Sequence, residues 1–371
     1  MHDLIRNMGR EIARESSTKP GKRSRLWFHE DALHILTTNS GTKAVEGLVL
    51  KSENTGRVHF NTYSFKKMDG LRLLQLDGVD LNGDYGNLSK KLRWLHWRGF
   101  TLNYIPDEFY QGNLVVINLK HSNIKKVWNK TQLMEKLKIL NLSHSKYLTS
   151  TPDFSKIPNL EKLIMKDCPS LFEIHPSIGV LNNLLRINLK DCTGLSHLPK
   201  KIYQLKSLEI LILSGCSKLD KLEEDIVQME SLAMLIADNT AIKKVPFSIV
   251  ISKRIRYISL CGYEGFSRDT FPSIIWSWMS PTMSSLPFSS LLHLRIIGVQ
   301  FRSKIQLTQE LRRILDDQYD VRFTEVETSH APQISNHSLR SLLIGMGSFY
   351  MVINTLSKSI SQVPSLSSWL F

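Results

Sequence analysis

The chain has 371 residues, of which 48 are Lys or Arg and 34 are Asp or Glu, and its formal net charge is +14. Apolar residues at 42% and charged residues at 22% exclude a wholly disordered chain. Four cysteines are too few for a disulfide-stapled secreted scaffold. The longest apolar-biased run, residues 342–353, is shorter than the roughly 18–20 residues that span a bilayer. We therefore expect no membrane span and a cytoplasmic or nucleo-cytoplasmic location.

The first 44 residues differ in pattern from the rest of the chain. Leu4, Met8 and Ile12 recur at the spacing of one helical face, which predicts a helix over the first 16 residues. A basic, turn-rich stretch follows, and residues 26–36 predict a second short helix that begins near His29. Because 44 residues are too few for a domain of their own, we expect residues 1–44 to be the end of a larger one.

The motif L-x-x-L-x-L recurs through the middle of the chain. Nine copies have starts that lie 21–24 residues apart. A first copy, VEGLVL, begins at Val45, and a degenerate last copy, LLHLRI, begins at Leu291. Such regular spacing is leucine-rich-repeat periodicity. The nine copies begin at Leu71, Leu92, Leu114, Leu137, Leu160, Leu184, Leu208, Leu232 and Ile255.

Each copy predicts a short strand whose side chains alternate between two faces. In the copy at Leu184, Ile187 and Leu189 face inward, whereas Arg186 faces outward. One such unit cannot bury its apolar side alone, so neighbouring units must stack and share a core. Prolines in the return segments suit an irregular convex side. The sequence therefore predicts an α/β repeat fold, a leucine-rich-repeat solenoid with parallel strands on its concave face.

The repeat weakens after residue 265. We expect the solenoid to occupy residues 45–300, preceded by the short helical remnant of residues 1–44. Residues 301–371 are expected to form an irregular carboxyl-terminal cap, because the last apolar layer of a solenoid must be covered. Leu307, Leu311 and Leu315 have helical spacing within that segment.

The outward-facing strand residues are the candidate binding surface. Large aromatic and Arg side chains tend to carry interface energy, and basic residues on the earlier strands give way to Ile and Met from Leu208 onward. The Lys and Arg residues occur in ones and twos, so we expect protein contact and no specific nucleic-acid binding. The candidate partner-binding residues are Trp94, His96, Arg98, Lys120, Lys166, Arg186, Lys190, Ile212 and Tyr257.

Three cysteines fall at the same place in successive copies. Cys168, Cys192 and Cys216 each lie eight residues after the first residue of their copy. One cysteine per repeat, with no second ligand nearby, does not match the paired spacing of zinc sites. We expect these cysteines to be buried small apolar side chains, and Cys261 to be exposed.

Motifs that carry chemistry are absent from the sequence. It has no G-x-x-x-x-G-K-[ST] phosphate cradle, no H-E-x-x-H, no C-x-x-C and no G-x-S-x-G. His96, His121 and His144 lie on or just after repeat strands, which favours rim positions over a catalytic or metal role. We expect no catalytic residues, no metal site and no cofactor in this chain.

Several segments resemble one known family. These segments are MHDL with LIRNMGREIARE at the start, SRLWFHEDALHIL after them, and the repeats LRWLHWRGFTLNYIPDEF and LKDCTGLSHLPKKIYQLKSLEILILSGCSKL. The chain resembles the plant nucleotide-binding leucine-rich-repeat disease resistance receptors of the Toll/interleukin-1 receptor class. The resemblance covers about residues 1–360. It implies that residues 1–44 are the end of the winged-helix nucleotide-switch domain with its linker, and that residues 301–371 are a truncated post-repeat segment.

The resemblance also implies a function. His2 matches the family's histidine on the phosphate side of ADP, and Asp3 matches its acidic neighbour. ADP or ATP belongs to the full-length family, and we expect this chain alone to bind neither usefully. The implied role is a recognition and regulatory region in defence signalling, whose partner is a pathogen effector, a host protein or the receptor's own nucleotide-binding domain. The alternative is a generic adaptor or scaffold, such as the substrate-recognition arm of a ubiquitin ligase.

Overall fold

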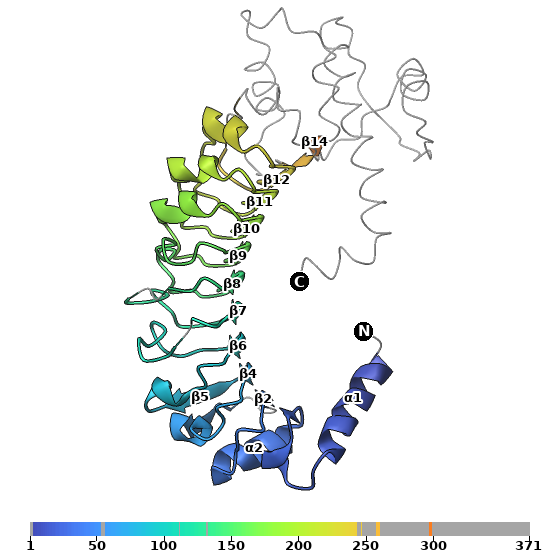
Figure 1. Cartoon of the computed structure of the whole chain (residues 1–371). Helices are drawn as coiled ribbons and strands as arrows, with labels where there is room; N and C mark the ends of the chain where they lie inside the picture. Colours follow the sequence, from blue (N-terminus) through green and yellow to red (C-terminus); the bar gives the residue numbers. More distant parts are fainter. Residues whose placement is uncertain are drawn as a thin grey trace, which may run out of the picture.

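A computed structural model describes residues 3–52, 56–110, 112–130, 133–242, 246, 257–259 and 297–298. Most of its strands follow one another along the inner side of a curved solenoid (Figure 1). Twelve of them form one sheet, and every neighbouring pair in it is parallel. These strands are β1 (Arg25–Leu26), β2 (Gly47–Lys51), β4 (Leu73–Asp77), β6 (Trp94–Arg98), β7 (Val116–Asn118), β8 (Ile139–Asn141), β9 (Lys162–Ile164), β10 (Arg186–Asn188), β11 (Ile210–Ile212), β12 (Met234–Ile236), β13 (Tyr257–Ser259) and β14 (Ile297–Gly298).

The register of the sheet follows the sequence repeat. From β2 to β13, each strand of this sheet begins at the third residue of its predicted copy. Ile187, for example, pairs with Leu163 on one side and Leu211 on the other, and all three are the fourth residue of a copy. The predicted leucine-rich-repeat solenoid is therefore confirmed for these copies.

The last predicted copy is placed wrongly. LLHLRI from Leu291 would put a strand at residues 293–295, but β14 lies at Ile297–Gly298 and pairs Ile297 with Ile258. Because Ile258 is the fourth residue of its copy, the matching copy starts at residue 294. The segment has apolar residues at both spacings, so periodicity alone could not choose between them.

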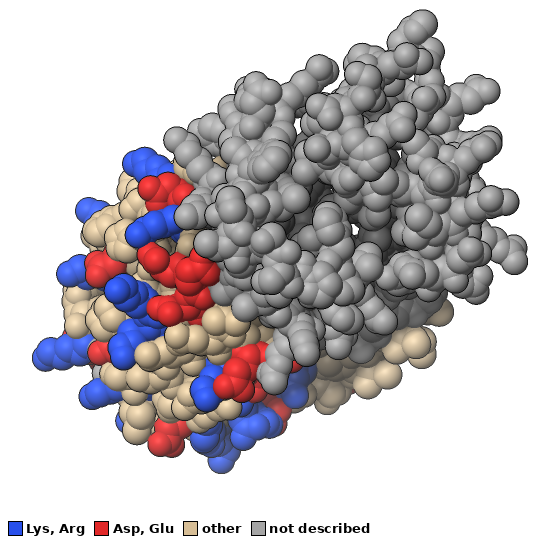
Figure 2. Space-filling view, turned by 90° about the horizontal axis from the view of Figure 1, so that it is seen from above, with Lys and Arg blue, Asp and Glu red and all other residues tan. Residues whose placement is uncertain are grey.

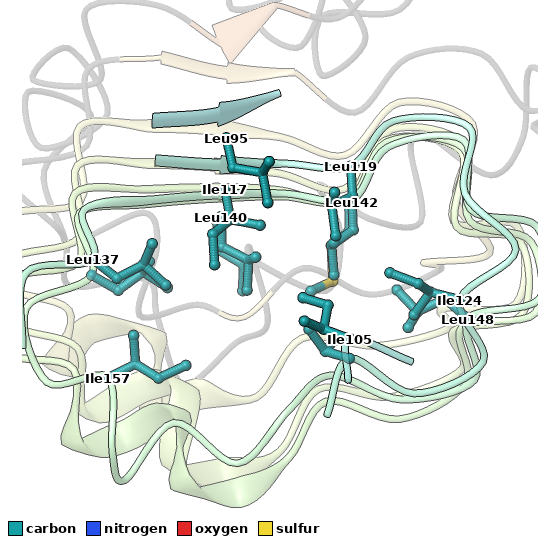
Figure 3. Packing of buried hydrophobic residues seen from close by; sticks show 14 of the residues in the cluster. Leu95, Ile105, Ile117, Leu119, Ile124, Leu137, Leu140, Leu142, Leu148 and Ile157 are labelled. Carbon is teal, nitrogen blue, oxygen red and sulfur yellow. The ribbon is translucent and has the colours of Figure 1, made fainter. Parts of the chain in front are cut away.

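The core consists of columns of equivalent side chains. Fourth-position residues such as Leu95, Ile117 and Leu140 stack beneath the strands, and sixth-position residues such as Leu119 and Leu142 form a second column (Figure 3). Each of these five side chains is at most 2% exposed. Burying one such side chain contributes about 1.5–3 kcal/mol. Stacking therefore supplies the stability that a single repeat lacks.

The return segments cross the convex side. Short 3-10 turns lie there, opposite the sheet (Figure 1). They are η2 (Thr62–Phe65), η3 (Tyr85–Asn87), η4 (Pro176–Val180), η5 (Lys200–Gln204) and η6 (Glu224–Gln228). A second, two-stranded parallel sheet joins β3 (Val58–Asn61) to β5 (Val79–Asn82). Pro176 begins η4, where its fixed φ suits the first turn of a helix.

The amino-terminal segment covers the first repeat. Helix α1 (Asp3–Glu15), η1 (Pro20–Lys22) and α2 (His29–Thr38) include both helices predicted from the sequence. Helix α2 buries Ala32, Ile35 and Leu36 in the same core as the repeats. Strand β1 extends the repeat sheet by pairing with β2, a feature that the repeat pattern did not predict. In contrast, α1 leaves Leu4 and Ile12 more than 60% exposed.

In the eight copies from Leu71 to Leu232, a left-handed residue lies at the eighth position, just beyond the strand. In five copies this residue is not glycine: His121, His144, Asp167, Asp191 and Asn239 have φ between 55° and 63°. His, Asp and Asn are the side chains that adopt this conformation most readily. Their recurrence explains why polar residues end these strands and turn the chain toward the convex side.

Candidate protein-binding face

The concave face is defined here as the third-, fifth- and seventh-position side chains of the copies. They alternate with the buried fourth and sixth positions, so they point away from the core. Along the described strands the third position is mostly apolar or aromatic, the fifth is rich in amides, and the seventh is rich in Lys and Arg. The alternation predicted from the sequence is thus confirmed, and it arranges three parallel rows of side chains on a rigid sheet.

Trp94 and His96 form the aromatic part of the concave face on β6. Their ring centroids lie 5.6 Å apart with 29° between the planes. Asn118 on β7 places its amide nitrogen 3.3 Å from His96 Nδ1. Burial lowers the pKa of His96, and the nearby Lys120 lowers it further. The ring is therefore held neutral at neutral pH, and with Trp94 it presents a flat surface suited to apolar contact.

The seventh-position row carries positive charge. Arg98, Lys120, Lys166 and Lys190 occupy it, and Arg98 lies 3.8 Å from the Asp77 carboxylate. These basic side chains are partly or fully exposed. On the face seen from above, basic and acidic side chains are interspersed (Figure 2). Within the seventh-position row itself, Asp77 and Asp238 interrupt the basic residues, so the row favours a partner with local acidic groups rather than a long polyanion.

Arg186 lies at the centre of the third-position row. It pairs in register with Lys162 on β9 and Ile210 on β11. Its exposure is intermediate, and burial lowers the pKa of its guanidinium. A half-buried Arg is the kind of side chain that anchors interfaces when a partner completes its burial.

Ile212 and Tyr257 are the two candidates that the structure does not place on the exposed surface. Ile212 was expected on the open surface, but only 5% of it is exposed. It pairs between Asn188 and Ile236 in the fifth-position row, and it offers a partner little area. Tyr257 begins β13 beside Met234, while the placement of its side chain lies outside the described residues, as does Cys261.

The residues matched to the ADP motif lie at the very start of the chain. Asp3 is the first residue of α1, and His2 lies outside the described residues. Leu4 and Ile5, which follow Asp3, are exposed. A nucleotide site needs a cradle of backbone N–H groups and a lysine, so the match of His2 and Asp3 to the ADP motif stays a prediction.

Metal ligands, cysteines and membrane-spanning helices also bear on function. The described residues contain no cluster of three or more His, Cys, Asp or Glu side chains that could hold a metal. Cys168, Cys192 and Cys216 are free and fully buried, as expected. No helix within the described ranges is long and apolar enough to cross a membrane.

The sequence analysis did not predict a pocket that lies where the first repeat strands begin. Arg72 and Arg93 both follow the first leucine of their copies and line a basic hollow together with Lys43 and Lys91. The available signal was the second position of LRLLQL and LRWLHW, which is Arg in both copies. Strand alternation singles out the third, fifth and seventh positions, so it predicts no role for the second.

The parallel sheet, stacked leucine columns and convex return segments define a leucine-rich-repeat solenoid. No family model matches the chain. It is 39% identical over 208 residues to Disease resistance protein RPV1 of Vitis rotundifolia, covering 48% of this chain and 15% of that protein. It is 32% identical over 179 residues to TMV resistance protein N of Nicotiana glutinosa, covering 48% and 16%. The chain is thus similar to plant disease resistance proteins of the class that the sequence suggested, and that resemblance is confirmed.

The matched part is a small share of those relatives, about one sixth of their length. Among solved structures, a leucine-rich-repeat protein of Leptospira interrogans aligns with a TM-score of 0.44 and 20% identity, covering 60% of this chain and 62% of that one. Internalin C2 of Listeria monocytogenes aligns with a TM-score of 0.35 and 14% identity, covering 57% and 84%.

Proposed function

We propose that this chain is the recognition and regulatory leucine-rich-repeat region of a plant immune receptor and binds a protein in defence signalling. The observation that carries the proposal is the concave face, where partly exposed aromatic and basic side chains are carried by a rigid parallel sheet. Similarity to disease resistance proteins over about half of the chain supports the same role. It also disfavours the alternative of a generic adaptor or ubiquitin-ligase arm.

The proposed partner is a protein, either a pathogen effector, a host protein or the receptor's own nucleotide-binding domain. Trp94, Arg98 and Arg186 are proposed as the anchors, because aromatic and Arg side chains dominate interface energy when a partner buries them. His96, Lys120, Lys166, Lys190 and Tyr257 are proposed to surround them. The mechanism is surface presentation, so the region itself needs no catalytic group.

The other divisions of the chain follow from the resemblance. Residues 1–44 are proposed as the end of the nucleotide-switch domain, residues 45–300 as the solenoid and residues 301–371 as a cap. In a longer receptor, His2 and Asp3 would lie beside ADP, with the phosphate cradle supplied by a preceding domain. A cytoplasmic or nucleo-cytoplasmic location suits such a receptor.

Site-specific photocrosslinking tests the proposed face. A photoreactive phenylalanine analogue replaces Trp94 in the full chain expressed in leaves, and replaces the exposed Lys126 in a control. We expect a discrete protein adduct from position 94 and none from position 126, and Arg98→Glu should reduce the adduct from position 94. Equal adducts at both positions, or none at position 94 in challenged and unchallenged leaves, would contradict the proposal.

A further inference from the structure

An open pocket of about 490 Å³ lies where the first three repeat strands begin. Its position is separate from the concave face, because second-position rather than third-position residues of the copies line it. Its volume falls within the range of about 300–1,000 Å³ that is usual for small-ligand sites. Unlike most such sites, its lining is mainly polar. The lining residues are Lys43, Glu46, Gly70, Arg72, Lys91, Arg93 and Asn113.

Positive charge in the pocket exceeds negative charge. Four of the lining side chains are cationic and one, Glu46, is acidic. Glu46 is already paired, since Arg25 Nη1 lies 2.8 Å from its carboxylate and Arg72 Nη1 lies 3.9 Å from it. The bond from Arg25 lowers the pKa of Glu46, so this carboxylate stays ionised and paired. Within the described part of the chain, Lys43, Lys91 and Arg93 have no acidic side chain at ion-pair distance.

Arg72 and Arg93 come directly before the neighbouring strands β4 and β6. The Arg93 N–H donates to the Arg72 carbonyl oxygen over 2.8 Å, so the two residues lie side by side. Like charges at directly adjacent positions of a sheet repel one another. An anion between the two guanidinium groups would remove that repulsion, and each guanidinium can donate two parallel hydrogen bonds to a phosphate.

Close packing fixes the backbone that surrounds the pocket. A Cβ atom on Gly70 would lie 2.1 Å from the Lys43 carbonyl oxygen, so only glycine lets these two segments meet. Asn113 is fixed by donating to the Lys90 carbonyl oxygen over 2.9 Å and accepting from Lys136 Nζ over 2.6 Å. The backbone at Gly70 and the side chain of Asn113 are therefore in place before any ligand binds, which reduces the entropy lost on binding.

We infer that this pocket binds a compact polyphosphate anion. Four cations around one hollow match several closely spaced negative charges better than they match the single charged centre of one phosphate. The polar lining offers little apolar surface for a nucleobase, so a nucleotide is not the favoured ligand class. The inference is independent of the proposed protein-binding face, because Arg72 and Arg93 do not belong to it.

Isothermal titration of the full chain with inorganic tripolyphosphate tests the inference. The site variant carries Arg72→Gln and Arg93→Gln, which remove two guanidinium groups and keep long polar side chains. The matched control carries Lys125→Gln and Lys126→Gln, two exposed cations outside the pocket. At about 150 mM salt we expect saturable one-to-one binding, weakened about tenfold or more in the site variant and about twofold or less in the control.

Two further arms decide between sources of the same chemistry. Inorganic phosphate should bind at least about tenfold more weakly than tripolyphosphate, and a short single-stranded DNA should bind weakly and equally in site and control variants. Thermal unfolding verifies that each variant is folded, and Arg93→Gln alone serves if the double variant is not. The inference is overturned by absent saturation, by equal weakening in both variants, or by tighter binding of DNA.

Discussion

The imidazole rings of His121 and His144 stack with centroids 4.3 Å apart and 4° between their planes. Both residues occupy the left-handed eighth position of consecutive copies, with φ of 56° and 63°. His144 Nδ1 also lies 2.9 Å from a carboxylate oxygen of Asp167, the eighth residue of the next copy. The same backbone turn occurs in each of these consecutive copies, and the copies stack on one another. Equivalent side chains are therefore neighbours although 23 residues separate them in sequence.

This arrangement predicts that acid destabilises the fold. His121 is exposed at the surface, but partial desolvation lowers its pKa, and the charges of His144, Arg98 and Lys120 lower that pKa further. The unfolded chain therefore binds more protons than the folded chain just below a pH of about 6.5, the ordinary pKa of histidine. Stability falls as the pH decreases through that window. We expect a lower thermal unfolding midpoint at about pH 5.5 than at about pH 7.5.

A variant isolates the contribution of the histidine pair. His121→Asn removes the titrating ring and keeps a residue that adopts the left-handed conformation readily. We expect a smaller pH-dependent change in midpoint for this variant than for the parent chain. His197→Asn, at an exposed position, should leave the change as it was. An unchanged pH dependence in His121→Asn would show that the pair does not disfavour protonation.

The inward column predicts a large cost for shortening Leu189. Its side chain is fully buried at the sixth position of the copy at Leu184. Leu189→Ala should lower the free energy of unfolding by about 2–5 kcal/mol, because a cavity remains where the repeats stack. Leu189→Asp should be worse, since it strands a charge in the core. Urea denaturation followed by circular dichroism measures both.

The neighbouring exposed residue provides the control for Leu189. Lys190→Ala removes a comparable amount of side chain from the concave face and should change the free energy of unfolding by about 0.5 kcal/mol or less. If Leu189→Ala and Lys190→Ala shifted the urea midpoint equally, the assignment of inward and outward positions would be wrong.

The solenoid was predictable from the sequence because two periodicities, the spacing of the copies and the alternation within each copy, indicate the same fold. The spacing of copies sets the repeat, and the alternation within each copy sets which side chains are buried; Leu163, Ile187 and Leu211 satisfy both. Strand β1 was not predictable, because two residues carry no alternation. Its pairing with β2 depends on the packing of α2 in the core.

The candidate site was predictable only in outline. Alternation places Trp94 and Arg186 on the concave face, but it cannot say how much of Ile212 its neighbours cover. The basic pocket depends on Arg72 and Arg93, whose spacing of 21 residues becomes adjacency only once the register is known. Contacts between side chains of different repeats therefore required the structure.

The cysteine column predicts slow reaction with thiol reagents. Cys168, Cys192 and Cys216 are fully buried, and each thiol donates to a carbonyl oxygen of the preceding repeat. Burial raises the pKa of Cys216 to about 12, and a hydrogen bond with Cys168 together with burial raises that of Cys192. We expect slow labelling of Cys192 and Cys216 in the native chain, because the thiolate is the reactive form.

Mass spectrometry after a timed pulse of iodoacetamide measures this labelling residue by residue. In about 6 M guanidinium chloride all three cysteines should react at the rate of a free thiol, which serves as the reference. Rapid native labelling of Cys192 and Cys216 while circular dichroism reports a folded chain would contradict the stacked, buried placement.

The final prediction concerns Gly215, the eighth residue of the copy at Leu208. Its φ is +76°, and a Cβ atom there would lie 2.2 Å from Asp191 Oδ1 and 3.1 Å from Asp191 Cα. Gly215→Ala should lower the free energy of unfolding by about 1–3 kcal/mol, since it adds left-handed strain to a clash with the preceding repeat. Urea denaturation measures the loss.

A double-mutant cycle separates strain from clash at this position. Asp191→Gly removes the clashing carboxylate while leaving a residue that tolerates the left-handed turn. In that background Gly215→Ala should lower the free energy of unfolding by less, because only the left-handed backbone strain and the contact with the Cα of residue 191 remain. The coupling energy between the two substitutions should exceed about 0.5 kcal/mol. Additive losses would mean that Asp191 does not restrict residue 215, and that the two turns pack less closely than the structure shows.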